Sequence, residues 1–253
     1  MKSYLYLVSH CFIALLFISL SIGSVEGTET IDDDFRILLV REGGNDPATG
    51  MPSGRLVVQA GYLDGVDEGQ SGMVWRKNKF TGQLEIATFE VTDVAPYESY
   101  GIFIVRHPDF YVLKTDRVNL RINARSDADV LARAIGSLDL GRCFDALLYF
   151  DRIYCANVDN SFVMGQANEC RQRVEKRLSA PPGSSTAAES KRLDVYEELE
   201  VAEGHHIHKN DLAADLHLKR VMTLDPNNRA AAELRKEVPE TALSTLFSPA
   251  RCK

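Results

Sequence analysis

The chain of 253 residues has little of what defines several protein classes. It holds only five cysteines and one tryptophan. It contains neither a collagen-like repeat nor a low-complexity composition, and this absence excludes collagen-like and disordered proteins. Lys and Arg number 29 against 36 Asp and Glu, a formal net charge of −7. This charge gives no reason to expect nucleic-acid binding. Long apolar runs are also scarce, which excludes a polytopic membrane protein. The remaining composition, 45% hydrophobic and 26% charged, is that of a globular protein.

The sequence also lacks the local motifs of common catalytic and cofactor sites. There is no Gly-x-Ser-x-Gly elbow, phosphate-binding loop, dinucleotide fingerprint or His-Glu-x-x-His helix. His205 and His208 are spaced to offer two metal ligands from one helix, but no cysteine or carboxylate at matching spacing completes a site. We interpret these histidines as solvated or helix-terminal groups. The sequence therefore predicts no enzymatic activity, no metal and no cofactor.

The one long apolar run lies at the N-terminus. From Cys11 to Ile22 the chain is almost wholly apolar, about the length of the hydrophobic region of a secretory signal peptide. Val25 and Gly27 supply short side chains at the −3 and −1 positions of a cut before Thr28. We expect residues 1–27 to be a signal peptide and the mature protein to be periplasmic or secreted, with no membrane insertion after cleavage. The alternative is an uncleaved single-span anchor.

Four cysteines follow the predicted cleavage site, an even number compatible with two disulfides in an exported chain. Two expected antiparallel helices that meet near residue 157 bring Cys143 opposite roughly position 171. We therefore predict a disulfide between Cys143 and Cys170. The pairing of Cys155 and Cys252 stays open.

Strand-like patterning predicts a small, barrel-like β-domain over residues 35–123. Six runs are rich in Val, Ile, Phe and Tyr and are bounded by Gly, Pro, Asn and Asp. The runs are Phe35–Arg41, Leu56–Gly61, Gly72–Lys77, Gln83–Val94, Ser99–Arg106 and Arg117–Ile122. In the fourth run the apolar phase changes between Ile86 and Ala87, which predicts a β-bulge or a strand bending around a small barrel. The acidic residues 28–34 are expected to be a short flexible lead-in.

From residue 126 onward the apolar period is that of helices, so the predicted fold class is α+β with two domains. We expect a helical unit with a third helix at 126–178, a flexible Pro/Ser/Ala linker at 179–190, a second unit at 191–238 and a tail at 239–253. The expected helices are Asp127–Leu140, Cys143–Cys155, Ser161–Leu178, Leu193–His208, Leu212–Leu224 and Arg229–Glu237.

Two parts of the chain resemble known families. From Arg55 to Leu120, strands alternate with turns at Gly65 and Gly69, where glycine permits tight reversal. This pattern resembles the small C-terminal β-domain of the flagellar assembly protein T family and of related envelope proteins. The family prefers glycine where Thr115 stands, so the last turn departs from the pattern.

The helical part resembles tetratricopeptide-like repeats, in which small residues let two antiparallel helices approach closely. The matching residues are Gly141, Ala146 and Phe150 in the first unit, and Ala202, Ala214, Leu218, Val221 and the turn Leu224–Asn228 in the second. The first unit departs from the pattern, because no Pro closes it. The alternative is a generic pair of helical hairpins. In such repeats the first helix of each unit usually lines the concave surface.

The two resemblances imply a non-enzymatic protein–protein interaction or assembly factor of the bacterial cell envelope. Its partner would be an envelope or surface-structure protein of unknown identity, and the sequence leaves the oligomeric state open. The predicted contact stripe on the first helix of the second unit consists of Tyr196, Leu199, Glu203 and His206, which share one helix face. A neighbouring stripe with Val201, Ala202 and His205 is expected to pack. The alternatives are an enzyme with a site between the domains and a membrane-anchored structural subunit.

Overall fold

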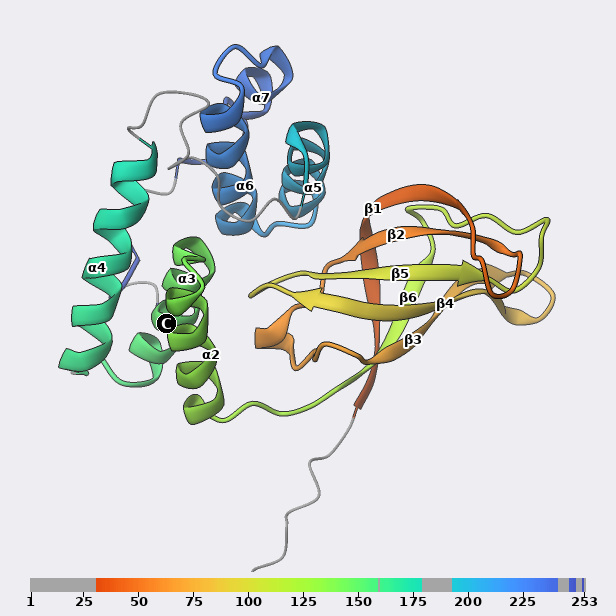
Figure 1. The fold of residues 1–253 in the computed structure, drawn as a ribbon, viewed down its shortest axis with the longest axis horizontal. Coiled ribbons are helices and arrows are strands. Elements are labelled where there is room, and N and C mark those ends of the chain that lie inside the picture. Colours follow the sequence, from red (N-terminus) through yellow and green to blue (C-terminus); the bar gives the residue numbers. More distant parts are fainter. Residues whose placement is uncertain (1–30, 159, 179–192, 241–245, 249–251, 253) are drawn as a thin grey trace, which may run out of the picture. The chain divides into compact units, whose positions relative to one another are not determined.

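In the computed structural model, the N-terminal half of the described chain forms a closed β-barrel, coloured orange to green in Figure 1. The structure describes residues 31–158, 160–178, 193–240, 246–248 and 252. The described strands follow the order β1-β2-β5-β4-β3-β6, and β6 pairs back onto β1. Their bounds are β1 Ile31–Asn45, β2 Pro52–Val58, β3 Ser71–Asn78, β4 Gly82–Val94, β5 Ser99–Val105 and β6 Arg117–Ile122. The α+β class and the predicted barrel are confirmed.

The predicted bulge lies in β4, where the apolar phase changes. Val74 of β3 pairs with Ala87, whereas the next residue, Trp75, pairs with Glu85, so Ile86 is the additional residue. Ile86 and Ala87 are therefore both buried, although consecutive residues of a regular strand point to opposite faces.

The first strand begins earlier than the sequence predicts. Ile31 pairs with Ile122, and pairing continues without a break to Arg36 opposite Arg117. Residues 31–34 are thus strand, and the prediction of a flexible lead-in is wrong for them, because their backbone closes the barrel against β6. The Asp34 carboxylate also accepts a hydrogen bond from the Trp75 indole at 2.9 Å. Residues 28–30 and the predicted signal peptide 1–27 lie outside the described residues.

A short 3-10 helix, Tyr62–Asp64, lies between β2 and β3. The described α-helices all follow the barrel in the chain. Their bounds are α2 Asp127–Asp139, α3 Cys143–Ala156, α4 Ser161–Leu178, α5 Val195–Ile207, α6 Asp211–Leu224 and α7 Arg229–Leu234. Helix α3 packs against α2 and α4, and α5 packs against α6. The small and apolar residues expected at helix contacts, Ala146, Phe150, Ala202, Ala214, Leu218 and Val221, are all buried.

Barrel and helices belong to one compact unit, Ile31–Lys253, so a division into two domains stays a prediction. The predicted linker 179–190 lies outside the described residues. No helix in the described ranges combines the length and apolar character needed to cross a membrane.

The C-terminal segment is held against the first helices rather than forming the predicted tail. Leu246 and Phe247 are buried in the core formed by α2, α3 and α4. The Phe247 backbone N–H donates a 2.7 Å hydrogen bond to Asp151, and Cys252 is disulfide-bonded to Cys155. The prediction of a tail over 239–253 is therefore wrong for these residues. These contacts could not be read from the sequence, because residues 239–253 show no apolar periodicity.

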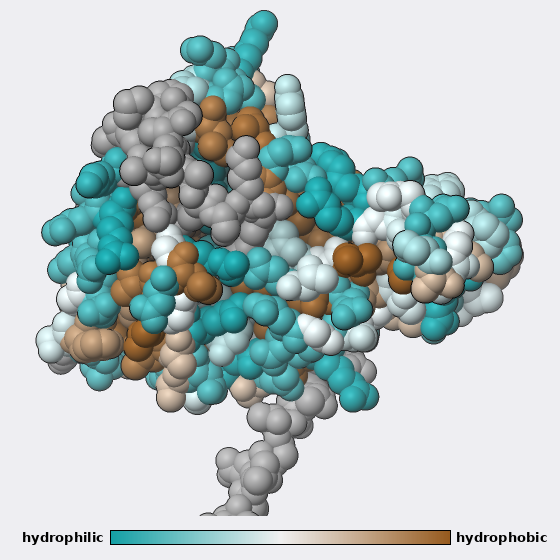
Figure 2. All heavy atoms as spheres, in the orientation of Figure 1, coloured by the Kyte–Doolittle hydropathy of each residue, from teal (hydrophilic) through white to brown (hydrophobic). Residues whose placement is uncertain are grey.

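The face of the molecule seen in Figure 2 is mostly hydrophilic, and hydrophobic side chains reach it in scattered patches. The exposed large hydrophobic residues of the described chain include Phe80 in the β3–β4 turn and Tyr196 on α5, with exposed fractions of 97% and 75%. Of the two, Tyr196 belongs to the contact stripe that the sequence predicts.

Candidate functional site

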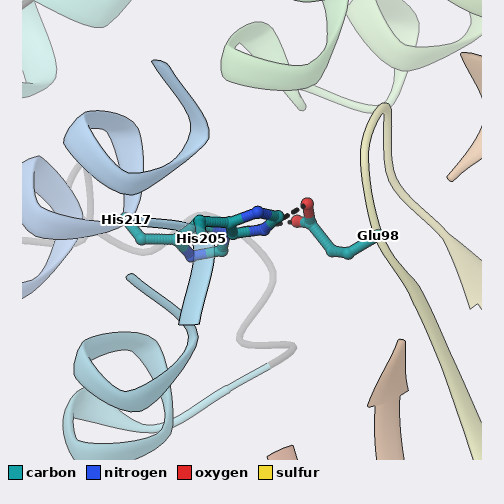
Figure 3. Close-up of side chains that lie close together, drawn as sticks. All are labelled: Glu98, His205 and His217. Carbon is teal, nitrogen blue, oxygen red and sulfur yellow. Dashed lines mark ion pairs between the residues drawn. The ribbon is translucent and has the colours of Figure 1, made fainter. Parts of the chain in front are cut away.

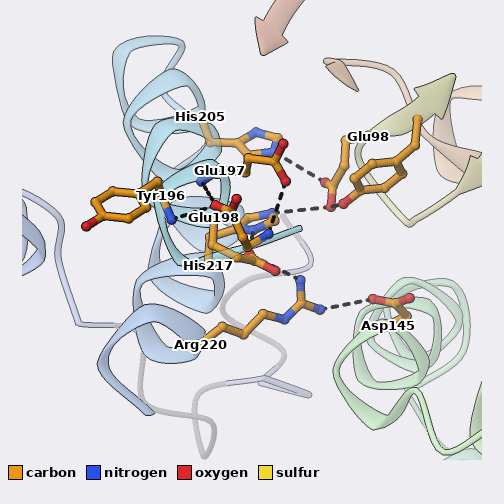
Figure 4. A network of polar contacts seen from close by, with 10 residues as sticks. Glu98, Asp145, Tyr196, Glu197, Glu198, His205, His217 and Arg220 are labelled. Atoms are coloured by element: carbon orange, nitrogen blue, oxygen red, sulfur yellow. Dashed lines mark hydrogen bonds and ion pairs between the residues drawn. The ribbon is translucent and has the colours of Figure 1, made fainter. Parts of the chain in front are cut away.

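The predicted contact stripe on α5 has an uneven exposure to solvent. Tyr196 and Glu203 are exposed, and the Tyr196 ring points away from the polar network behind it (Figure 4). Leu199 is half-buried against the core shared by α5, α6 and α7, and His206 contacts Asp211 at 2.7 Å. Tyr196 and Glu203 are thus the two members of the stripe that a partner can reach most freely.

The packing stripe of α5 is buried as predicted: Ala202 faces α6, whereas Val201 faces the barrel. Val201 lies in a cluster with Leu38 and Leu39 of β1. A Cβ added at Gly204 would approach the Leu38 side chain to 2.9 Å, so glycine allows the close approach of helix and strand. This contact fixes the orientation of α5 on the barrel.

Ion pairs border the same contact between α5 and the barrel. Glu197 accepts from Arg55 at 2.7 Å, and Glu200 accepts from Arg41 at 2.7 Å. Lys114 also pairs with Glu200. The basic side chains of these pairs are partly exposed, so each pair contributes little stability individually, but several together fix register and orientation.

A buried cluster of Glu98, His205 and His217 lies close to these pairs (Figure 3). The sequence does not predict this cluster. Glu98 precedes β5, His205 lies on α5 and His217 on α6. Glu98 Oε2 is 3.3 Å from His205 Nε2, and Glu98 Oε1 is 3.2 Å from His217 Nε2. The exposed fractions of Glu98, His205 and His217 are 4%, 0% and 2%. The burial of His205 confirms its assignment to the packing stripe, and its interpretation as a solvated group is wrong.

The cluster carries separated charges because its groups perturb one another. Burial disfavours ionisation of Glu98, but the charge of His217 and the contacts with both histidines together outweigh it and hold the Glu98 pKa well below its usual range. Burial alone would lower the pKa of His217, but the Glu198 and Glu98 carboxylates raise that pKa to about 9. Burial lowers the pKa of His205.

A second layer of polar contacts surrounds His217 (Figure 4). Its Nδ1 lies 2.5 Å from Glu198 Oε2, and Glu198 lies 3.8 Å from Arg220. Arg220 in turn reaches Asp145 of α3 at 3.4 Å. The network thus joins the barrel to three helices.

A groove lies between the barrel and α2. The alternative of an enzyme with a site between the domains would place its active site in such a groove. Its lining includes Glu68, Asp93, Arg133 and Arg142. These side chains pair with one another: Arg133 lies 2.6 Å from Glu68, and Arg142 lies 3.3 Å from Asp93. Arg133 of α2 and Arg142 at the start of α3 thus link these helices to the barrel.

One disulfide is present among the described cysteines. The structure joins Cys155 to Cys252, the pairing that the sequence left open. Cys143 and Cys170 are both buried thiols here, with no disulfide between them, although their side chains meet through a hydrogen bond. That hydrogen bond, with burial, raises the pKa of the Cys170 thiol. The Cys143–Cys170 disulfide stays a prediction.

Comparison with known proteins assigns no identity. No family model matches the chain, and a search of curated proteins returns no match.

Proposed function

We propose that the mature protein is an exported interaction or assembly factor of the bacterial cell envelope, without enzymatic activity. Its barrel would act as a small β-domain like that of the flagellar assembly protein T family. Its α2–α3 and α5–α6 pairs would act as tetratricopeptide-like units of a second domain. The partner would be a segment of an envelope or surface-structure protein.

The observation that carries the proposal is the arrangement of α5. One face of this helix is fixed on the barrel by Val201 and Gly204, and another packs on α6 through Ala202. The remaining face presents Tyr196 and Glu203 to solvent. A rigid helix that presents an aromatic anchor beside a charge suits peptide recognition, because little conformational entropy is lost on binding.

The disulfide between Cys155 and Cys252 supports the exported location, since structural disulfides persist in oxidising compartments. We predict that the protein purified from its native compartment begins at Thr28, because Val25 and Gly27 suit signal peptidase. N-terminal sequencing or intact mass spectrometry of the extracellular or periplasmic fraction checks this. A membrane-bound product that retains Met1 would support the anchored alternative instead.

Recognition through α5 is tested by substituting both exposed residues of the stripe, Tyr196→Ala with Glu203→Ala. We expect capture of the partner from an envelope extract to weaken at least about tenfold, since loss of a buried aromatic anchor commonly has this effect. Quantitative mass spectrometry of the captured proteins measures the change.

The matched control replaces an exposed aromatic and an exposed acidic residue on the barrel, Phe80→Ala with Glu90→Ala. The control should capture partners as the wild type does, and both variants should keep the wild-type melting temperature. Equal capture by the two double variants, or a large fall in stability of the α5 variant alone, would contradict the assignment of this face to binding.

A further inference from the structure

The cluster of Glu98, His205 and His217 has the composition and spacing of a metal site. Each residue offers one ligand atom, and the three atoms lie within 4.8 Å of one another. Figure 3 shows both imidazole rings directed at the Glu98 carboxylate. We propose that these three side chains bind one divalent transition-metal ion, with Zn²⁺ as the best fit, and that the ion locks the α5–α6 hairpin onto the barrel.

The three groups lie almost as close together as ligands around a small ion. Zinc binds histidine nitrogen and carboxylate oxygen at about 2.0–2.2 Å, usually in tetrahedral geometry. Neighbouring ligand atoms on such a tetrahedron are about 3.3–3.6 Å apart. Glu98 Oε2 lies 3.3 Å from His205 Nε2, Glu98 Oε1 lies 3.2 Å from His217 Nε2, and one ligand atom from each of the three residues lies within 4.8 Å of the others. To receive an ion, the carboxylate and the two imidazoles would close further around a single point.

The fold itself places the two imidazoles together. Helix α5 ends at Ile207 and α6 begins at Asp211, so the tight connection sets His205 beside His217 on adjacent helices. The rings are stacked, with centroids 5.5 Å apart and an interplanar angle of 19°, so both can present Nε2 to one point. Glu98 approaches that point from the barrel.

The donor set selects the class of metal. Two imidazoles and one carboxylate suit Zn²⁺ and neighbouring first-row transition metals, whereas Ca²⁺ and Mg²⁺ prefer sites made of oxygen ligands. The surrounding contacts are those of a metal site as well. Glu198 contacts His217 Nδ1 at 2.5 Å, which leaves Nε2 as the nitrogen that can bind metal. The Tyr100 hydroxyl donates to Glu98 Oε1 at 2.9 Å and orients the carboxylate.

His205 distinguishes a metal site from an ordinary buried ion pair. Its exposed fraction is 0%, its Nδ1 has no hydrogen-bond partner among the described residues, and its Nε2 is held only by the 3.3 Å contact with Glu98 Oε2. A buried imidazole held by one long contact is unfavourable, because it loses its contacts with water and regains only part of them. A metal ion would give Nε2 a shorter bond than the contact with Glu98 supplies. Because all three ligands are shielded from solvent, we assign the ion a structural role.

The test uses the mature protein without an affinity tag, stripped with a chelator and then titrated with Zn²⁺ against a chromophoric competitor. We expect one ion per chain and a rise in melting temperature when zinc is added. Co²⁺ in place of zinc should give the visible absorption bands of a low-coordinate site. These wild-type measurements need no substitution.

Variants then assign the ligands. His205→Gln should abolish stoichiometric binding, and Glu198→Gln should weaken it about 10- to 100-fold, because an outer carboxylate orients its histidine. The matched controls, His206→Gln and His208→Gln, change neighbouring histidines of the same turn and should bind zinc as the wild type does.

Wild-type protein that binds no stoichiometric zinc or cobalt would overturn the proposal, whatever the variants do. Binding that survives in a folded His205→Gln chain but is lost in His206→Gln or His208→Gln would overturn it too, because the ion would then sit on the accessible end of α5. Partner capture by the Tyr196 and Glu203 variant is measured separately, so failure of the metal site and failure of the proposed function can be told apart.

Discussion

Removing the Cys155–Cys252 bridge is expected to lower the free energy of unfolding by about 2–5 kcal/mol. The bond joins residues 97 positions apart, and the stabilisation from a cross-link grows with the length of the loop it closes. It also holds in place the segment whose Phe247 ring packs edge-on against Tyr154 at 5.8 Å. The variant Cys155→Ser with Cys252→Ser removes the bond without leaving an unpaired thiol, and urea unfolding followed by circular dichroism measures the loss.

The double variant provides its own control for reduction. With Cys143 and Cys170 as thiols, as they are in the structure, a reductant should destabilise the wild type to the level of the double variant and leave the double variant unchanged. A further fall in the double variant would reveal a second reducible bond, the predicted one between Cys143 and Cys170. A wild type that unfolds at the same urea concentration with and without reductant would show that the bridge does not stabilise the fold.

Replacing Gly101 with alanine should destabilise the barrel by about 3 kcal/mol or more. A Cβ at this position would lie 2.1 Å from the backbone oxygen of Glu90 and 2.5 Å from the Phe89 ring. Phe89 can rotate only into a filled core, and the Glu90 backbone belongs to the β4 ladder beside β5. Relief of the clash therefore requires separating the two strands.

The fluorescence of Trp75, the single tryptophan of the chain, reports unfolding of the barrel because it lies on β3. Gly165→Ala is the matched control: it lies on α4 with nothing within 4 Å of an added Cβ, and it should stabilise by about 0.5–1 kcal/mol. A Gly101→Ala protein with the wild-type unfolding midpoint would mean that β4 and β5 are not paired in this register.

The strands and helices could be predicted from the sequence because each carries its own periodic pattern. The phase change at Ile86 predicts the bulge, since an additional residue reverses which positions of a strand point inward. Alternation also predicts β6 at Arg117–Ile122, the bounds that the structure has. The start of β1 could not be predicted in this way, because Asp32, Asp33 and Asp34 hide a strand whose backbone pairing does not depend on apolar side chains.

The buried cluster could not be predicted because its members are brought together only by tertiary packing. Glu98 is distant in the sequence from both histidines, and His217 stands among the apolar residues of α6 with no motif around it. The one available signal is a polar residue at a packing position: His205 falls on the same stripe as Val201 and Ala202. Anchoring of the C-terminal segment was missed for a similar reason, because Leu246 and Phe247 are too few to form a pattern.

The claim that the outward face of α5 recognises a partner is tested most directly by site-specific photo-crosslinking in living cells. A photoreactive phenylalanine analogue would replace Tyr196 in one strain and Phe80, on the barrel turn, in another. We predict a discrete crosslinked adduct of one envelope protein from position 196 and none from position 80. No adduct from position 196, or the same adducts from both positions, would contradict recognition by this face.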